Sequence, residues 1–411
     1  MARAVLSTES KLDLAVVTSS RADYSHLYWP LRAFERSELL RPHLVVMGPH
    51  LSEDFGSTAT AIEDDGFDIS ARVPCLEDDD TDRGMALTLG RATTELADLF
   101  DRTRPDLVLL IADRYEMLAP ASAALALRIP IAHIEGGELS EGAIDNAVRN
   151  ALTMMSHVHF TSTERARERV IAMGEEPWRV HRAGAPSLDH ARRPDLLGRT
   201  ELEGELDLAL DRPTALVAYH PVTLDRDTTA ESQSVLSALE TAIAKLDLQL
   251  LICHPNADAG GRWIADRLRD LCARRPHRAR FLVNLEPRRY WSLLHQVDLL
   301  VGNSSSGIME AASIPVGAVD VGWRQRGRER GANVMGVPGE PEAILTAIAQ
   351  GLSEPFRQSL DGMENLYGDG RGSERIRRVL EDLPPAHRLL EKRHQRLSQR
   401  LSSPSLECQR L

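Results

Sequence analysis

The sequence has 411 residues, more than a single hydrophobic core usually organises, so we expect two domains. Its 61 acidic side chains outnumber 49 basic ones, and the formal net charge of -12 argues against nucleic acid or an anionic membrane surface as the main partner. No apolar run reaches the roughly 18 residues that a membrane-spanning helix needs.

Strand and helix patterns alternate through the first part of the chain. Apolar runs predict strands at 14–18, 43–47, 106–113, 129–134 and 157–163, and helical periodicity predicts helices at 25–36, 84–102, 115–127 and 145–155. Runs that are apolar on both faces are typical of parallel strands covered by helices. We therefore expect residues 1–190 to form a first α/β domain with a doubly wound sheet.

The alternation stops in a polar stretch that contains Pro194 and Pro213, and we interpret residues 191–213 as an interdomain segment. It then restarts, with strands predicted at 214–219, 248–253, 279–285, 297–302 and 314–322 and helices at 229–245, 258–274, 287–295 and 306–312. Residues 214–383 are thus expected to form a second Rossmann-like domain. The basic remainder, 384–411, is expected to be an exposed or frayed helical tail, or a disordered one.

Polar residues follow four predicted strands of the first domain. They are Arg21, His50, Asp113, Arg114 and the acids of HIEGGELSEGAIDN, which are Glu135, Glu138, Glu141 and Asp145. Because the carboxyl ends of parallel strands meet at one edge, four such loops together indicate a site. Glu135 at a strand end and Asp145 at a helix start are expected to face an interdomain cleft. For Glu138 and Glu141, solvation or positioning is explanation enough.

The second domain shows the same arrangement. His220, and then His254 with Asn256, follow predicted strands. In GNSSSGIMEA, Ser304 and Ser305 open a helix whose N–H groups suit a diphosphate, and Glu310 could accept hydrogen bonds from ribose; alternatively a serine only caps the helix. A last cluster, RQRGRERG, offers a positive wall for a phosphate or a solvated face; its arginines are Arg324, Arg326, Arg328 and Arg330.

Several other classes of site are disfavoured. The sequence has no GxxxxGK[ST] and no GxGxxG motif, which weakens nucleotide-triphosphatase and dehydrogenase interpretations. Its 14 histidines and 4 cysteines show no metal-ligand spacing, and we expect neither a metal nor a cofactor. The cysteines form no disulfide framework, and charged residues interrupt any N-terminal signal core, so a reducing cytoplasm is expected.

The chain resembles the hydrolysing UDP-N-acetylglucosamine 2-epimerases. The resemblance covers about residues 12–335 and rests on these motifs, in order: SSRADYSHL, GPHLSEDFG, ADRYEM, HIEGGELSEGAIDN, AGAPSLD, HPVT, HPNADAGG, GNSSSGIMEA and RQRGRERGANV. It implies the two-domain GT-B architecture, a UDP-sugar substrate, no cofactor, and a homodimer or homotetramer. It also implies elimination of UDP to a 2-acetamidoglucal, followed by hydration to free N-acetylmannosamine for sialic-acid-type sugar biosynthesis.

The resemblance carries residue roles over by motif position. Asp113, Glu135 and Asp145 match the family's catalytic carboxylates, and His220 matches its catalytic or phosphate-contacting histidine. Its nucleotide contacts match Arg21, Ser25, Arg114, Asn256, Ser304, Ser305, Glu310 and Arg324. His50 and Arg328 are further binding candidates from their strand-end positions.

Two residues depart from the family pattern: Ala112 stands where the family has glycine, and Asn146 where it has a second carboxylate. The alternatives keep the mechanism on UDP-N,N'-diacetylbacillosamine or a GDP-linked amino sugar, or replace it. Replacements are a GT-B glycosyltransferase, a non-hydrolysing epimerase and a non-catalytic sensor. The acid cluster disfavours the glycosyltransferase, HIEGGE fits the non-hydrolysing enzyme less well, and the retained carboxylates argue against the sensor.

Overall fold

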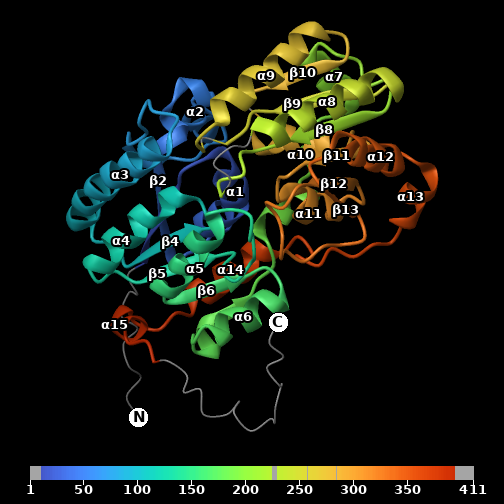
Figure 1. The fold of residues 1–411 in the computed structure, drawn as a ribbon. Helices are drawn as coiled ribbons and strands as arrows, with labels where there is room; N and C mark the ends of the chain where they lie inside the picture. Colours follow the sequence, from blue (N-terminus) through green and yellow to red (C-terminus); the bar gives the residue numbers. More distant parts are fainter. Residues whose placement is uncertain (1–10, 225–228, 257, 284, 394–411) are drawn as a thin grey trace, which may run out of the picture.

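The computed structural model describes residues 11–224, 229–256, 258–283 and 285–393. Two parallel sheets organise them, with strand orders β3-β2-β1-β4-β5-β6-β7 and β10-β9-β8-β11-β12-β13 (Figure 1). In each sheet the first strand lies inside, the chain runs outward to one edge, and it returns to build the other half. This is the doubly wound order, so the two predicted α/β sheets are confirmed.

The first sheet consists of β1 (Leu12–Thr18), β2 (Leu40–Met47), β3 (Ile69–Val73), β4 (Leu107–Ile111), β5 (Ile131–Ile134), β6 (Val158–Thr161) and β7 (Val180–Arg182). Its helices are α1 (Arg21–Glu35), α2 (Ala59–Asp64), α3 (Asp82–Thr103), α4 (Leu118–Ala126), α5 (Asp145–Met155) and α6 (Glu164–Ala172). Helix α7 (Arg199–Leu206) follows on the way to the second sheet.

The second sheet consists of β8 (Thr214–Ala218), β9 (Gln249–Cys253), β10 (Ala279–Leu282), β11 (Leu299–Gly302), β12 (Gly317–Val321) and β13 (Val334–Val337). Its helices are α8 (Thr229–Lys245), α9 (Gly261–Arg274), α10 (Pro287–Leu294), α11 (Ser306–Met309), α12 (Pro341–Gly351) and α13 (Glu354–Ser359). Two helices close the described chain, α14 (Gly372–Glu381) and α15 (Ala386–Leu390).

Alternate side chains of the inner strands build two cores, one on each face of the first sheet. Leu14 and Val16 of β1 pack with Leu27 of α1, whereas Ala15 and Val17 pack in the cluster on the α3 side. Because successive strand side chains point to opposite faces, a strand covered on both sides must be apolar throughout. This is why the inner strands could be recognised as apolar runs.

The strands that sequence patterns missed lie at sheet edges. Strand β3 alternates between half-buried and exposed residues, β7 has 3 residues, and β13 contains no fully buried residue. Each has only one neighbouring strand. An edge strand needs no continuous apolar run, so the hydrophobic signal is weak there.

The segment expected to link the domains belongs to a core. Leu197, Leu202 and Leu208 are buried in one cluster with Trp291 of α10 and Leu216 of β8. Helix α7 therefore covers the second sheet and does not form a bare linker.

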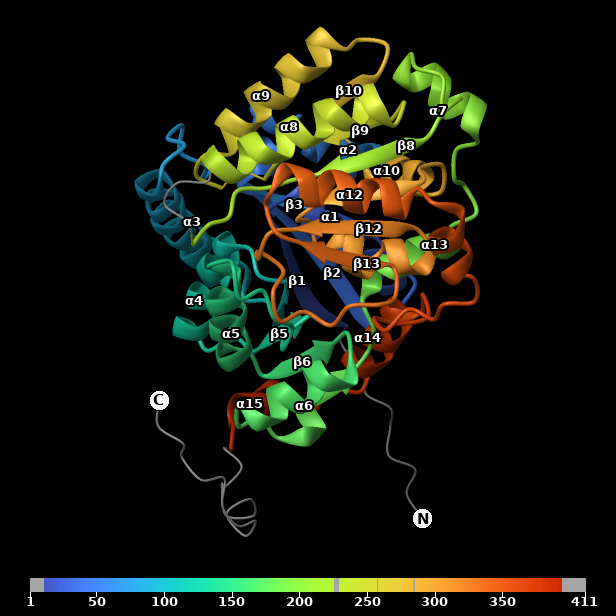
Figure 2. The ribbon, with the colours of Figure 1, turned by 45° about the vertical axis from the view of Figure 1, so that its right-hand side comes forward.

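The chain returns to the first sheet after the second one is complete. Helix α14, which falls in the range predicted for the second domain, packs on α1, and both views place α14 and α15 beside the first-domain strands (Figures 1 and 2). The outgoing and returning segments touch, because the Ala185 N–H donates to the Tyr367 carbonyl at 2.8 Å. A Cβ on Gly184 or Gly368 would lie 3.2 Å from the other segment's backbone.

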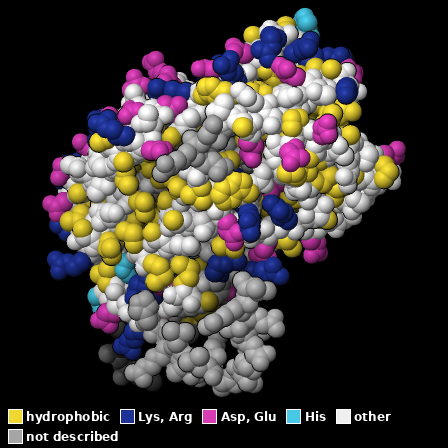
Figure 3. All heavy atoms as spheres, viewed as in Figure 1, with side chains coloured by type: hydrophobic (Ala, Val, Ile, Leu, Met, Phe, Trp, Pro, Cys, Tyr) yellow, Lys and Arg dark blue, Asp and Glu magenta, His cyan; other side chains and the backbone are white. Residues whose placement is uncertain are grey.

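The expectation of an exposed tail is wrong for residues 386–393. Leu389 is buried, Arg179 donates to the carbonyls of Leu389 and Glu391, and Lys392 pairs with buried Glu175. Residues 394–411 lie outside the described part. Within that part no helix is long and apolar enough to cross a membrane, and charges of both signs are interspersed on the face in Figure 3.

We expect Gly302→Ala to destabilise the protein on the order of 3 kcal/mol. Gly302 ends β11 at φ +145°, and an added Cβ would lie 2.1 Å from the Ala218 carbonyl oxygen. The matched control is Gly90→Ala in α3, where nothing lies within 4 Å and where alanine should add about 0.5–1 kcal/mol. Urea unfolding followed by circular dichroism compares them, and equal midpoints for the two variants would contradict this prediction.

Candidate active site

A polar cavity of about 90 Å³ lies where the carboxyl ends of the two sheets face each other. Its lining combines loops from both sheets: Ala22, Asp23, His26, Ala112, Asp113, Arg114, Glu135, Glu138, Ser140, Asp145 and Arg149 from the first, and His220, Asn256, Ser304, Ser305, Arg324, Gln325 and Arg328 from the second. All the predicted catalytic residues are therefore gathered in one place, together with most predicted binding residues.

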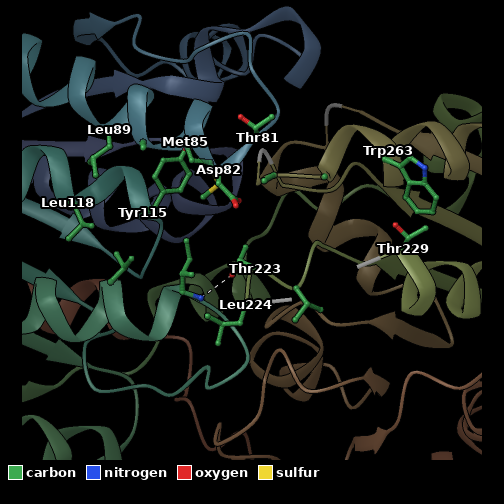
Figure 4. Close-up of a pocket in the computed structure, with 16 residues that line it drawn as sticks. Thr81, Asp82, Met85, Leu89, Tyr115, Leu118, Thr223, Leu224, Thr229 and Trp263 are labelled. Atoms are coloured by element: carbon green, nitrogen blue, oxygen red, sulfur yellow. Dashed lines mark hydrogen bonds between the residues drawn. The ribbon is translucent and has the colours of Figure 1, made fainter. Parts of the chain in front are cut away.

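A wider cleft of about 970 Å³ opens beside this cavity. Figure 4 shows Met85, Leu89 and Tyr115 on its first-domain side and Leu224 and Trp263 on its second-domain side. Neighbours in sequence line both spaces, since Ile144 borders the cleft and Asp145 the polar cavity. A hydrogen bond of 3.0 Å from the Ile144 N–H to the Thr223 hydroxyl joins the domains at this point.

Left-handed turns end two central strands and set the direction of the side chains that follow. Ala112, after β4, has φ +57°, and Glu135, after β5, has φ +65°. Non-glycine residues adopt this conformation at a cost of roughly 1–3 kcal/mol, and such strain is typical of functional sites. The position of Ala112 explains why glycine would be the unstrained choice there.

His26 joins two acids that come from different domains. Its Nδ1 lies 2.7 Å from Glu135 Oε1, and its Nε2 lies 3.3 Å from Glu310 Oε1. Burial alone would lower the pKa of His26, but the two carboxylates raise it well above its usual value. Burial alone would raise the pKa of Glu310, yet hydrogen bonds and the charge of His26 hold it at about 2. The three side chains thus form a chain of paired charges across the cleft.

Arginines hold the other two predicted catalytic acids. Arg149 of α5 pairs with Asp113 and also donates to the Glu138 carbonyl at 2.9 Å. Asp145, in the first turn of α5, lies 3.6 Å from Nη2 of Arg324 in the second domain. Burial raises the pKa of the Asp145 carboxyl, against the opposing effect of Arg324. Each acid therefore sits in a distinct electrostatic environment, which is how carboxyls of one site acquire different roles.

His220 is fixed in one tautomer by the backbone. The Asn256 N–H donates to its Nδ1 at 3.1 Å, so the ring proton is on Nε2. Burial, followed by the charges of Arg324, Arg21 and Arg114, lowers the pKa of His220 well below its usual value. Asn303 clamps the His220 backbone through both its side-chain amide groups, at 2.8 and 2.9 Å. The histidine is a neutral hydrogen-bond donor held among cations.

The serine loop and the arginine cluster are only partly as expected. Ser304 and Ser305 line the cavity, but α11 spans one turn, so little helix dipole acts there. Arg324 and Arg328 are buried in the lining, and Arg324 also donates to the Asn303 carbonyl. Arg326 and Arg330 instead pair with Glu141 and Asp320. Two of the four arginines therefore form the positive wall.

Four predicted binding residues lie outside the polar cavity. Arg21 borders an adjoining space that shares Arg114 and Asn256 with it, and its guanidinium donates to the Val283 carbonyl at 3.0 Å. Ser25 and Glu310 are outside the lining, although Glu310 reaches it through His26.

His50 is the fourth, and its ring is fully buried. Its two ring nitrogens bond the hydroxyls of Thr18 and Thr58, at 2.9 and 2.7 Å. Both nitrogens are therefore already used within the fold.

Sequence reasoning missed His26, Arg149 and Gln325, and it misjudged Glu138. Glu138 was expected to be solvated but is 2% exposed in the lining. The i, i+4 spacing of Asp145 and Arg149 on one helix was an available signal for Arg149. Asn146, one of the departures from the family, lies outside the lining and accepts a hydrogen bond from the Ser140 N–H at 3.1 Å.

The lining suits a polar organic ligand. Buried atoms that lack a hydrogen-bond partner among the described residues include Glu138 Oε1, Ser140 Oγ, Gln325 Oε1 and the Nε atoms of Arg149, Arg324 and Arg328. Since buried polar groups are normally paired, donors and acceptors together favour a ligand that carries both. No group of three or more His, Cys, Asp or Glu within the described ranges has metal-site geometry.

We expect His26 to carry both ring protons at pH 7.5, because Glu135 and Glu310 raise its pKa. Long-range ¹H–¹⁵N NMR of the imidazoles should show imidazolium shifts for His26 between pH 6 and 8. His50 is the internal control and should stay neutral, since burial lowers its pKa to about 3. Neutral ring shifts for His26 at pH 7 would contradict the charge chain.

Comparison with known proteins agrees with this geometry. The family model for UDP-N-acetylglucosamine 2-epimerase matches residues 32–381. The chain is 35% identical over 377 residues to the UDP-N,N'-diacetylbacillosamine 2-epimerase (hydrolyzing) of Legionella pneumophila, covering 92% of this chain and 97% of that one. It is 32% identical over 351 residues to the GDP/UDP-N,N'-diacetylbacillosamine 2-epimerase (hydrolyzing) of Campylobacter jejuni, covering 85% and 90%.

Solved structures show the same fold. The UDP-GlcNAc 2-epimerase from Neisseria meningitidis, bound to UDP-GlcNAc, aligns with a TM-score of 0.75 and 16% identity over 89% of this chain and 99% of that one. Both sheets fall within this alignment, which confirms the expected GT-B architecture. The match over residues 32–381 and the sequence identity to full-length relatives place the chain in the UDP-N-acetylglucosamine 2-epimerase family.

Proposed function

We propose that this chain is a hydrolysing UDP-sugar 2-epimerase. It eliminates UDP across C1–C2 of a 2-acetamido sugar and then hydrates the glycal, which yields UDP and a free sugar inverted at C2. The observation that carries the proposal is the single polar cavity in which Asp113, Glu135 and Asp145 of one domain face His220 and Arg324 of the other. Family membership and the relatives that are named hydrolysing enzymes support it.

The lining supplies the groups that elimination needs. A base must take the weakly acidic C2 proton, and carboxylates in a buried site can do so. Glu135 is the best placed, because His26 fixes its orientation at 2.7 Å while the carboxylate lines the cavity. Asp145 is the second candidate, and its raised pKa suits a group that exchanges protons.

The second domain offers the counterpart for the leaving diphosphate. Arg324 and Arg328 provide positive charge, while Ser304, Ser305 and the Nε2–H of His220 provide hydrogen-bond donors. Charge-assisted bonds to a phosphate strengthen as negative charge develops on the departing oxygen. Arg21 and Asn256, in the adjoining space, are proposed to contact the rest of the nucleotide.

Two sugars are candidates for the substrate. UDP-N,N'-diacetylbacillosamine is favoured by the names of the two relatives described above, and UDP-N-acetylglucosamine by the name of the family. We propose the diacetylated sugar first, which reverses the preference that the sequence motifs suggested. N-acetylmannosamine as product, a role in sialic-acid-type biosynthesis, a cytoplasmic location and a homodimer or homotetramer stay predictions.

Incubation in D2O, with products followed by NMR, tests the reaction. Each of the two UDP-sugars should be offered separately, and kcat/KM should be higher for the diacetylated one. The expected product is the free 2-epimer with deuterium at C2, because the proton lost in elimination is replaced from solvent. A product that retains UDP would indicate a non-hydrolysing epimerase, and no turnover of either sugar would refute epimerase activity.

Glu135→Gln should lower kcat on the order of 10³-fold, because the amide cannot accept the C2 proton. UDP should still bind with a Kd within about threefold of the wild-type value, since the diphosphate contacts lie on the second domain. Isothermal titration with UDP and a turnover assay on the same preparation separate the two effects. Equal losses in binding and turnover would show that Glu135 has a structural role.

A further inference from the structure

Glu138 is an acid of the polar cavity that the reaction scheme above does not use. It lies in the loop between β5 and α5, is 2% exposed and lines the cavity with Glu135. Its Oε1 is buried and has no hydrogen-bond partner among the residues described. A buried carboxyl oxygen left unpaired by the fold is costly to keep unless the site uses it.

The backbone around Glu138 is fixed. Arg149 donates to its carbonyl at 2.9 Å, Arg169 donates to the Gly137 carbonyl, and the Ser140 N–H donates to Asn146. These bonds tie the loop to α5 and α6 on either side. The carboxyl group is therefore positioned in the cavity wall and does not sample the solvent.

The surroundings favour a carboxyl that holds a proton near neutral pH. Burial raises the pKa of Glu138 to about 7, with Glu135 and Glu329 adding to the effect of burial and Arg328 and Arg169 opposing it. Arg149 and Tyr367 complete the charged and titratable groups around it. Glu135, by contrast, is engaged with the His26 ring at 2.7 Å and is arranged as an acceptor.

The stereochemistry of the proposed reaction requires two proton-transfer groups at C2. Elimination removes the C2 proton from one face of the sugar. Because the product is inverted at C2, hydration must deliver a proton to the opposite face. The residue that took the first proton cannot reach that face of a sugar held in place, so a second acid is needed.

We propose that Glu138 is this second catalytic residue and protonates C2 of the glycal in the hydration step. The inference rests on the proposed function. The C1=C2 electron pair forms the new C2–H bond with the Glu138 proton, which leaves positive charge on C1 and the ring oxygen. Water bonds to C1 and gives a proton to the Glu138 carboxylate just formed. The sum of these transfers is the addition of one water, and Glu138 regains its proton.

Glu138→Gln tests the proposal, because the amide fills the same volume but cannot donate an acidic proton. UDP release and the sugar products should be quantified by NMR in the same reaction. We expect UDP release within a few-fold of wild type, with the ratio of glycal to free 2-epimer raised on the order of 10²-fold. Glu138→Asp keeps a carboxyl group and should retain part of the hydration.

Glu141→Gln is the matched control. Glu141 lies three residues on in the same loop, has a side chain 46% exposed, and pairs with Arg326 at 3.2 Å on the surface. Its product ratio should equal that of wild type.

Two results would overturn the assignment of Glu138 alone. One is a Glu138→Gln variant that forms the free 2-epimer at the wild-type rate without excess glycal. The other is a variant in which UDP release and hydration fall by the same factor. Failure of the wild-type protein to release UDP from either UDP-sugar would overturn the proposed function, and this assignment with it.

Discussion

Buried charges of opposite sign, contributed by different domains, hold the two sheet edges against each other. Arg114 of the first domain pairs with Asp258 of the second at 2.8 Å, Asp145 lies 3.6 Å from Arg324, and His26 reaches Glu310. Removing one partner of such a pair leaves an unpaired buried charge, which typically costs about 3–5 kcal/mol. The arrangement of the domains and the electrostatics of the cavity are consequently one property, and neither can change without the other.

Strain and polarity are concentrated at the same place. The left-handed residues Ala112 and Glu135 end neighbouring central strands, and each is followed or accompanied by an acid of the cavity. Rigid, fully buried strands behind them supply the packing that keeps these turns in place. A scaffold of this kind can hold carboxyls in different protonation states within a small volume, as separate proton transfers at one carbon demand.

The sequence predicted the parts of this protein that depend on a single chemical pattern. Inner strands are apolar throughout, and polar residues directly after them meet at one edge, so Asp113, Glu135, Asp145 and His220 could be located. Edge strands such as β13 escaped because exposure on one side removes the apolar run. Residues that enter the cavity from a helix face or a folded loop, such as His26 and Glu138, depend on tertiary packing that no local pattern records.

The chain passes between the domains twice, and the two passages run side by side. Ala185 is hydrogen-bonded to Tyr367, and Gly184 and Gly368 bring the two backbones together more closely than any side chain would permit. Two adjacent connections act like the pins of a door hinge: they permit rotation about the line that joins them and resist twisting or sliding. Opening of the cleft is thereby restricted to one swing, and each closure returns the acids of one domain to the same register with the arginines of the other.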